Sequence, residues 1–350
     1  MDDAPAHRLP SSRVRVARSV AVDRGPIGGI AVTADGRRLL ATNYGDDTVS
    51  IIDTVSCSVV DTVFQADEPF SVAVGPASSG WAYVTAGSNA ADAVLAIDVN
   101  TAEVAGCYPV AMDIGDLVAD PTSSRVYFTR TCSTGVDVLV LDADMRPCGS
   151  VNVASYPGAA AAGLRVSANG RWLYVAVRQP SGDTITVLDR GLNIIDVIAV
   201  GASITDLAAS PDGGRLYVAT ADSDGRGRVD EVDARTHVVR SSRAVQGRLV
   251  QLMVSRDGRR VYLVSEDAVL VVCAYTNEVL ARVAGIVDPS CAAESPDGSR
   301  LYIAGFDGTV SVARLTDLPA PALAPAAASL REQLDLDDAV SRMLQLQPAG

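Results

Sequence analysis

The chain has 350 residues, of which 48% are hydrophobic, and a formal net charge of −13 at pH 7. An acidic chain is repelled by nucleic-acid phosphates and by anionic lipid headgroups, so its charge argues against both as partners. All 29 basic residues are arginine, which removes Schiff-base lysines and P-loop lysines from the candidate chemistry.

The N-terminal residues are not expected to act as a secretory signal. Residues 1–20 lack an apolar core, and Asp2 and Asp3 stand where a secretory signal would carry positive charge. No run of 18 apolar residues in the sequence marks a transmembrane helix. We therefore expect a cytoplasmic protein without membrane insertion, or a cell-envelope protein if a leader has been removed.

Few residues suit nucleophilic catalysis or metal ligation. The two histidines, His7 and His237, fall in a polar tail and a predicted outer strand, so Ser-His-Asp, Cys-His and histidine-ligated metal sites are poorly supported. None of the six cysteines forms a C-x-x-C motif, which argues against zinc and redox motifs. Cys107 and Cys148 occupy similar places in neighbouring outer strands, where free thiols and a disulfide are alternatives.

A tight turn recurs every 40–46 residues along the chain. The turns lie at residues 35–36, 79–80, 123–124, 169–170, 212–213, 257–258 and 297–298. Most are followed by an aromatic residue and a β-former, such as Tyr83-Val84 and Tyr174-Val175. Repeats of this length with short β-rich units predict radially stacked four-stranded blades, which is a β-propeller.

Each repeat is expected to form four strands, a to d, in chain order. The predicted strands a span residues 29–33, 71–75, 116–120, 163–167, 206–210, 251–255 and 291–295. The predicted strands c span residues 48–53, 93–98, 137–142, 184–189, 228–233, 268–273 and 309–314. Because neighbouring blades cover both faces of such strands, they are apolar nearly throughout.

The seventh repeat lacks a strand d, because the chain becomes rich in Pro and Ala after Leu315. Residues 14–22 form a strand left over before the first repeat. Pairing the two ends closes the ring and removes exposed strand edges. The sequence therefore predicts an all-β, seven-bladed β-propeller over residues 14–315, closed by the N-terminal strand and preceded by a tail at residues 1–13.

The C-terminal residues differ from the repeats. Residues 316–328 are a Pro/Ala-rich linker, and Ser329–Glu332 is a capping box that opens a short amphipathic helix predicted over residues 329–347. Such a helix is marginal alone, so it should dock on its own propeller or on a partner. Its apolar face comprises Leu330, Leu334, Leu336, Val340, Met343 and Leu344.

The stretch Leu40–Thr54 resembles the repeat unit of the bacterial YVTN-repeat β-propellers, a family of seven-bladed propellers that includes lactonase-like proteins. Ala41–Asn43 and Asp47–Asp53 carry the match. The resemblance covers residues 14–315 and implies the propeller fold. In lactonase members it also implies a polar channel with His or Arg and carboxylates, and here the predicted channel offers Arg165 and carboxylates but no histidine.

Strand a lines the channel of a propeller, and its small or polar side chains are expected to face inward. This places five ligand-binding candidates near the channel mouth: Ser71, Asp116, Arg165, Asp206 and Gln251. Asp116 and Asp206 could hold a hard cation such as Ca²⁺ through oxygen ligands, or could orient a small polar ligand together with Arg165. The third alternative is a water-filled channel in which Arg165 neutralises its acidic neighbours.

The fifth repeat departs from the pattern at Glu231, where other repeats carry an aliphatic residue. A carboxylate there is costly unless it is paired. We expect an ion pair between blades, with Arg226, Arg228 or Arg248 as the partner.

These features predict a non-enzymatic scaffold that binds a protein or peptide partner. The candidate surfaces are the C-terminal helix and the top face, which is the face where the d–a and b–c loops lie. The alternative is a lactonase-like hydrolase with a divalent cation at the channel mouth. No cofactor is expected beyond the Ca²⁺ of that alternative, and the oligomeric state is left open.

Overall fold

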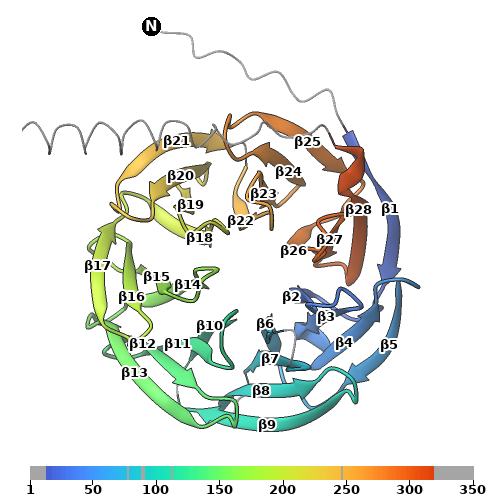
Figure 1. Cartoon of the computed structure of the whole chain (residues 1–350), viewed down its shortest axis with the longest axis horizontal. Coiled ribbons are helices and arrows are strands. Elements are labelled where there is room, and N and C mark those ends of the chain that lie inside the picture. The colour runs from blue at the N-terminus through green and yellow to red at the C-terminus, as the bar shows by residue number, and fades with distance from the viewer. Residues whose placement is uncertain (1–12, 77–78, 88–90, 112, 246, 319–350) are drawn as a thin grey trace, which may run out of the picture.

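The computed structural model describes residues 13–318, apart from residues 77–78, 88–90, 112 and 246. The described strands form seven four-stranded blades in a ring around a central channel (Figure 1). Neighbouring strands of a blade are antiparallel. The all-β, seven-bladed propeller predicted from the sequence is confirmed.

Each blade begins at the channel with strand a and ends at the outer rim with strand d. Blade 1 comprises β2 (Ile27–Val32), β3 (Arg38–Asn43), β4 (Thr48–Asp53) and β5 (Ser58–Val63). Blade 2 comprises β6 (Pro69–Val74), β7 (Trp81–Ala86), β8 (Asp92–Asp98) and β9 (Glu103–Val110). Blade 3 comprises β10 (Ile114–Ala119), β11 (Val126–Cys132), β12 (Gly135–Leu141) and β13 (Pro147–Ala154). Blade 4 comprises β14 (Ala160–Val166), β15 (Trp172–Arg178), β16 (Thr184–Asp189) and β17 (Ile194–Ala199).

The remaining blades follow the same order. Blade 5 comprises β18 (Ser203–Ala209), β19 (Arg215–Ala221), β20 (Gly227–Asp233) and β21 (Val239–Val245). Blade 6 comprises β22 (Leu249–Val254), β23 (Arg260–Ser265), β24 (Ala268–Cys273) and β25 (Val279–Ala284). Blade 7 comprises β26 (Pro289–Glu294), β27 (Arg300–Gly305), β28 (Thr309–Arg314) and β1 (Arg13–Ala21).

The N-terminal strand β1 closes the ring. It pairs antiparallel with β28, where Ser19 lies opposite Ser311 and Val20 opposite Val310. Its first residues also pair in parallel with β25, so blades 6 and 7 share one eight-stranded sheet. The predicted closure by residues 14–22 is confirmed, with boundaries that differ by one residue.

Every strand a begins two or three residues before its predicted start. Strand β2, for example, begins at Ile27 and β14 at Ala160. Each of these strands shifts register against strand b near its first residues, as between Ile27 and Gly29. Such a bulge interrupts the side-chain alternation, and this is why the sequence pattern hid the start of the strand.

The glycines of the repeating turns explain why the period is visible in the sequence. Six of the seven turns carry a glycine at the second position, with φ between 65° and 72°. This left-handed conformation strains a residue that has a Cβ atom. The seventh turn, at Ser123-Ser124, is the exception.

Among the described residues, buried side chains form seven clusters, each shared by two neighbouring blades. Strand b contributes tyrosines such as Tyr174 and Tyr217, and burial raises the pKa of both to about 12. Because the apolar area is buried between blades rather than within one, the ring is stable only as a whole.

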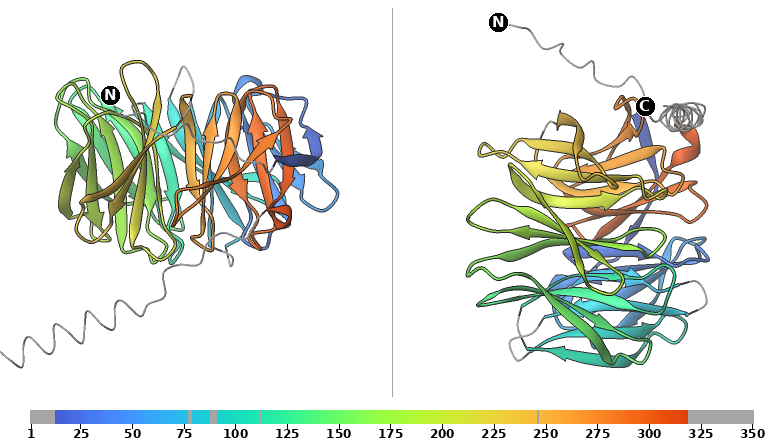
Figure 2. Two further views of the ribbon diagram at one scale, coloured as in Figure 1. Left: turned by 90° about the horizontal axis from the view of Figure 1, so that it is seen from above. Right: turned by 60° about the vertical axis from the view of Figure 1, so that its left-hand side comes forward.

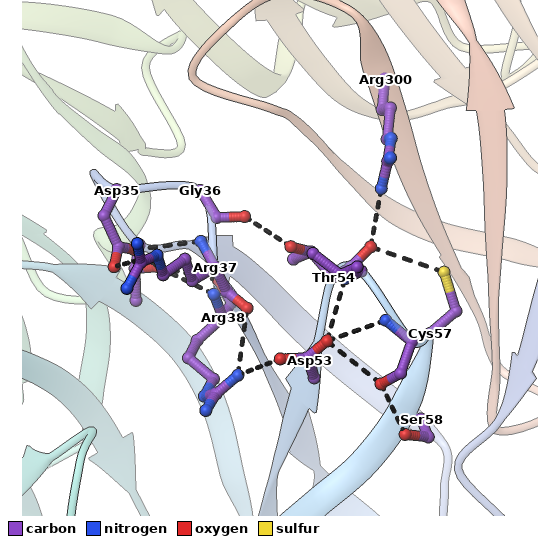
Figure 3. A network of polar contacts seen from close by, with 12 residues as sticks. Asp35, Gly36, Arg37, Arg38, Asp53, Thr54, Cys57, Ser58 and Arg300 are labelled. Atoms are coloured by element: carbon purple, nitrogen blue, oxygen red, sulfur yellow. Dashed lines mark hydrogen bonds and ion pairs between the residues drawn. The ribbon is translucent and has the colours of Figure 1, made fainter.

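Arginines at the start of strand b link neighbouring blades on the bottom face, where the a–b and c–d turns lie. Arg300 Nη1 donates to the Thr54 carbonyl of blade 1 at 2.6 Å, and Thr54 Oγ1 donates to the Gly36 carbonyl at 2.6 Å (Figure 3). Arg215 of blade 5 makes the matching contact with the Ala274 carbonyl of blade 6 at 2.8 Å. These contacts reinforce the blade junctions, including the one at which the ring closes.

We expect Arg300→Ala to lower the free energy of unfolding by about 1–2 kcal/mol, because a charge-assisted hydrogen bond across the closing junction is lost. Arg37→Ala is the control, since the Arg37 side chain is exposed and lies 4.0 Å from Asp35. That control should change the free energy by less than about 0.5 kcal/mol. Equal effects in urea unfolding would show that Arg300 does not reinforce the junction.

Aspartates in the bottom-face turns remain ionised at low pH. Hydrogen bonds from the amide and hydroxyl of Ser56 lower the pKa of Asp53 to about 2. Those from Ser295 and Ser299 lower the pKa of Asp297 to about 2. Because these values lie below the ordinary 3.8, the stability that the two groups contribute is present above about pH 4 and is lost as the pH falls toward 2.

The double variant Asp53→Asn/Asp297→Asn should therefore lose less stability than the wild type between pH 4 and pH 2. Asn keeps the side-chain oxygen that accepts the turn hydrogen bonds but does not titrate. Urea midpoints measured from pH 7 to pH 2 test this expectation. An identical pH dependence in both proteins would contradict it.

The chain leaves the propeller through η2 (Leu315–Asp317). The predicted helix at residues 329–347, residues 319–328 of the linker and residues 1–12 of the tail lie outside the described residues. Over the part of the chain that the structure describes, no helix is long and apolar enough to cross a membrane.

Candidate functional site

The central channel encloses a cavity of about 620 Å³. Strands a form its walls, and many lining residues are glycine or alanine. Of the five predicted site residues, Ser71, Asp116, Arg165 and Gln251 line the cavity. Asp206 does not line it and is only 5% exposed.

Four of the predicted site residues form one network across blades 2 to 5. Ser71 Oγ donates to Asp116 Oδ1 at 2.7 Å. Arg165 Nη1 donates to Asp116 Oδ2 at 2.5 Å, and its Nη2 donates to Asp206 Oδ1 at 2.7 Å. Although burial opposes the charge of Arg165, the carboxylates of Asp206 and Asp116 raise the pKa of its guanidinium.

Backbone amides of neighbouring blades bind the same side chains. Asp116 Oδ2 accepts from the Leu164 amide at 3.2 Å, and Asp206 Oδ2 accepts from the Leu252 amide at 2.8 Å. Gln251 Oε1 accepts from a strand-a amide of blade 7 at 2.6 Å. Each side chain thus ties its own strand a to that of the next blade. We call Ser71, Asp116, Arg165, Asp206 and Gln251 the channel brace.

The channel brace offers little to a cation. The guanidinium of Arg165 already lies between the carboxylates of Asp116 and Asp206. No group of three or more His, Cys, Asp or Glu among the described residues is placed to hold a metal ion. A Ca²⁺ ion at the two aspartates would have to displace Arg165. The contacts match the alternative in which Arg165 neutralises its acidic neighbours.

Two further polar residues line the cavity. Arg178, at the end of β15, donates through Nε to the Ile204 carbonyl at 3.2 Å. Arg178 was not predicted, because it lies on a strand b and only strands a were expected to line the channel. Burial raises the pKa of the Cys291 thiol to about 12, so this thiol is protonated at neutral pH and is a poor nucleophile.

Glu231 has an arginine partner, but the predicted partner and location were wrong. Arg215 Nη1 lies 3.8 Å from Glu231 Oε1, and Ser241 Oγ donates to Glu231 Oε2 at 3.1 Å. Both contacts are within blade 5 rather than between blades. Arg215 is a diagonal cross-strand neighbour of Glu231, a relation set by strand register. The three predicted arginines pair instead with Asp224, Asp230 and Glu266.

The structure favours free thiols over a disulfide for the two outer-strand cysteines. Cys107 and Cys148 are both exposed, and both are free thiols.

The top face carries a group of exposed apolar side chains on the loops of blades 7, 1 and 2. Val287 is 60% exposed, Phe306 52%, Tyr44 44% and Phe64 66%. We call these four residues the top-face arc. Exposed apolar side chains that gather on one face commonly mark an interaction surface.

Backbone hydrogen bonds hold the two b–c loops that carry Phe306 and Tyr44 of the top-face arc. The Phe306 amide donates to the Asp288 carbonyl at 2.9 Å, and the Tyr44 amide donates to the Pro26 carbonyl at 2.9 Å. Each bond joins a b–c loop to the preceding d–a loop. The arc therefore lies on ordered backbone next to the ring closure.

Charged side chains flank the top-face arc. The guanidinium of Arg24 lies 5.3 Å from the centroid of the Phe64 ring. The Tyr44 hydroxyl lies 3.5 Å from Glu68 Oε2. Asp46 accepts from a backbone amide at 3.1 Å, and Asp47 from another at 2.8 Å. These loops carry more acidic side chains than basic ones, so the surroundings of the top-face arc are negatively charged.

The fold and the channel define the chain as a closed seven-bladed β-propeller protein. It is 38% identical over 325 residues to the seven-bladed beta-propeller protein Rv1057 of Mycobacterium tuberculosis, a match that covers 83% of this chain and 82% of that protein. The chain therefore belongs to the family of Rv1057-like seven-bladed β-propeller proteins. A seven-bladed beta-propeller protein of Mycolicibacterium smegmatis is 35% identical over 190 residues, which cover 54% of this chain and 51% of that protein.

Two further similarities concern the propeller. The family of the lipoprotein LpqB beta-propeller domain matches residues 149–279. Hydrazine synthase of Kuenenia stuttgartiensis superposes with a TM-score of 0.74, covering 83% of this chain and 96% of that one. At 16% identity this similarity shows the fold alone.

Proposed function

We propose that this protein is a non-enzymatic scaffold that binds a protein or peptide partner through its top face. The observation that carries the proposal is the top-face arc, because four large apolar side chains are exposed together on loops of one face. Aromatic residues on ordered backbone bury large areas on binding at little entropic cost. We also propose that the repeats belong to the YVTN type, as the sequence of Leu40–Thr54 indicates.

The charge around the top-face arc indicates the chemistry of the partner. Asp46, Asp47 and Glu68 lie in the same loops as Tyr44 and Phe64. Complementary charge steers association and suppresses wrong partners. We therefore propose a partner segment that combines apolar residues with arginine or lysine.

The hydrolase alternative has weaker support. The carboxylates of Asp116 and Asp206 are bound by Arg165 and by backbone amides. A general base needs a free carboxylate within reach of its proton. The Cys291 thiol is protonated at neutral pH, and the described channel lining contains no histidine.

The proposal is tested by cross-linking in the native host followed by affinity purification and mass spectrometry. The double variant Phe64→Ser/Phe306→Ser should lose at least about 90% of the partner that the wild type recovers, a loss equivalent to tenfold weaker binding. Tyr156→Ser is the matched control, since Tyr156 is 53% exposed on a d–a loop outside the arc. Equal recovery by the wild type and the double variant would overturn the proposal.

A further inference from the structure

A second exposed apolar surface lies on the outer rim of blades 4 and 5. On β17, Ile194 is 49% exposed, Ile195 49% and Val197 51%. Val238, directly before β21, is 60% exposed, and Val239, its first residue, is 50% exposed. We call these five residues the rim patch. Single exposed aliphatic residues are ordinary, but five on or directly beside two neighbouring outer strands need an explanation.

The two halves of the rim patch lie next to each other. His237 Nδ1, in the turn before β21, is 2.5 Å from Asp196 Oδ2 on β17. This contact joins the outer strands of the two blades, which follow each other along the rim (Figures 1 and 2). The rim patch is therefore one surface, on the side of the ring away from the top-face arc.

The described chain ends where its continuation can reach the rim patch. The Leu315 amide donates to the Ser299 carbonyl at 2.8 Å in the a–b turn of blade 7, so the chain leaves at the bottom face. Leu318 is only 8% exposed and packs in the cluster that blades 6 and 7 share. Blade 6 adjoins blade 5, and the start of β21 lies at the bottom face.

The segment beyond Leu318 has the length to cover this surface. Residues 319–328 are rich in Pro and Ala, and ten residues of extended Pro-rich chain span roughly 31 Å. The following segment repeats apolar residues at helical spacing, with Leu330, Leu334 and Met343 among them. A helix of that length gains most of its stability from packing an apolar face.

Charge favours this segment over a basic partner at the rim patch. Residues 329–347 carry four acidic side chains, Glu332, Asp335, Asp337 and Asp338, against two arginines. Beside the rim patch, Arg235 and Arg240 are exposed. Asp196 stands within the patch and is 48% exposed, and its carboxylate lies against His237. Arg240 also binds Asp233, and Arg235 remains at the edge of the apolar surface.

From these observations we infer that residues 329–347 form an amphipathic helix that covers the rim patch of the same chain. The helix buries Ile194, Ile195, Val197, Val238 and Val239 and leaves the top-face arc open. This inference does not depend on the proposed function, because the two surfaces share no residue.

Hydrogen exchange of the full chain, followed by mass spectrometry, tests the inference. Amides of residues 330–346 should exchange at least tenfold more slowly than a free peptide of that sequence. The full-chain variant Ile195→Ser/Val239→Ser should remove most of this protection. The matched control is Val59→Ser/Val60→Ser on β5 of blade 1, whose side chains are 36% and 48% exposed; it should leave the protection unchanged.

A reciprocal variant, Leu334→Ser/Val340→Ser, should expose β17 and β21 to faster exchange without altering the propeller. Thermal unfolding confirms that each variant is folded. Free-peptide exchange in the wild type, or protection that survives the rim variant, would overturn the inference. If a dimer dissociates on dilution and the protection of residues 330–346 is lost with it, the rim patch binds a second copy of the chain. That result would also overturn the inference.

Discussion

Replacing Arg165 by Met will lower the free energy of unfolding by about 3–5 kcal/mol. The change removes the cation between Asp116 and Asp206 and leaves two carboxylates close together, one of them buried. Removing one partner of a buried ion pair has this cost, because the remaining charge has lost both solvent and counter-ion. Equilibrium unfolding in urea, read by circular dichroism, measures the change.

Two further variants show whether the loss comes from the carboxylates. Adding Asp206→Asn to Arg165→Met should restore at least about 1 kcal/mol, because a neutral amide costs less to bury than an unpaired charge. Arg178 lines the same cavity without joining the channel brace, and Arg178→Met gives up one hydrogen bond, to the Ile204 carbonyl. It should therefore cost about 1–2 kcal/mol, clearly less than Arg165→Met. If Arg165→Met proves as stable as Arg178→Met, the brace does not hold the blades together.

Deleting residues 1–21 will abolish the cooperative thermal transition and cause aggregation. Without β1, the edge of β28 is unpaired, and Val14 and Val20 leave the clusters on both sides of blade 7. An exposed long strand edge pairs readily with other chains. The expected result is light scattering at temperatures where the intact protein remains folded and does not aggregate.

A deletion of residues 1–12 is the control, because it keeps the whole of β1. This shorter deletion should shift the midpoint of thermal unfolding by less than about 2 °C, as expected for a free-energy change below about 0.5 kcal/mol. If the protein that lacks residues 1–21 does not aggregate and still unfolds cooperatively, closure by β1 is contradicted.

The fold could be read from the sequence because its periodic signals are local. The left-handed glycines such as Gly36 and Gly298 mark the turns, and strand b follows with a buried tyrosine. Ring closure followed from a count of strands at the two ends. The starts of strand a could not be read, because a bulge near Gly29 and its counterparts breaks the alternation there.

The candidate site could be predicted as a list of residues but not as a set of contacts. Spacing along strand a placed Asp116, Arg165 and Gln251 at the channel. It could not show that Asp116 binds the Leu164 amide, since that contact depends on the distance between neighbouring blades. The partner of Glu231 was missed for the related reason that strand register selects Arg215.

The top-face arc was not predicted at the level of residues. Tyr44 and Phe306 come directly after strand b, where an aromatic residue looks like a continuation of the strand. The type of residue does not show whether its side chain is exposed. Their common feature is that both stand in b–c loops on either side of the ring closure. Comparing the repeats therefore assigns residues to strands and loops. Only the folded structure shows which loop side chains are exposed to solvent on the same face.

We propose that this propeller works through its top face and that the channel brace is structural. The most direct measurement compares the partner recovered by Phe64→Ser/Phe306→Ser with that recovered by Arg178→Met, at equal amounts of folded protein. We predict that the arc variant loses the partner while the channel variant keeps it. If the arc variant keeps the partner and the channel variant loses it, binding through the top face is contradicted and the function belongs to the channel.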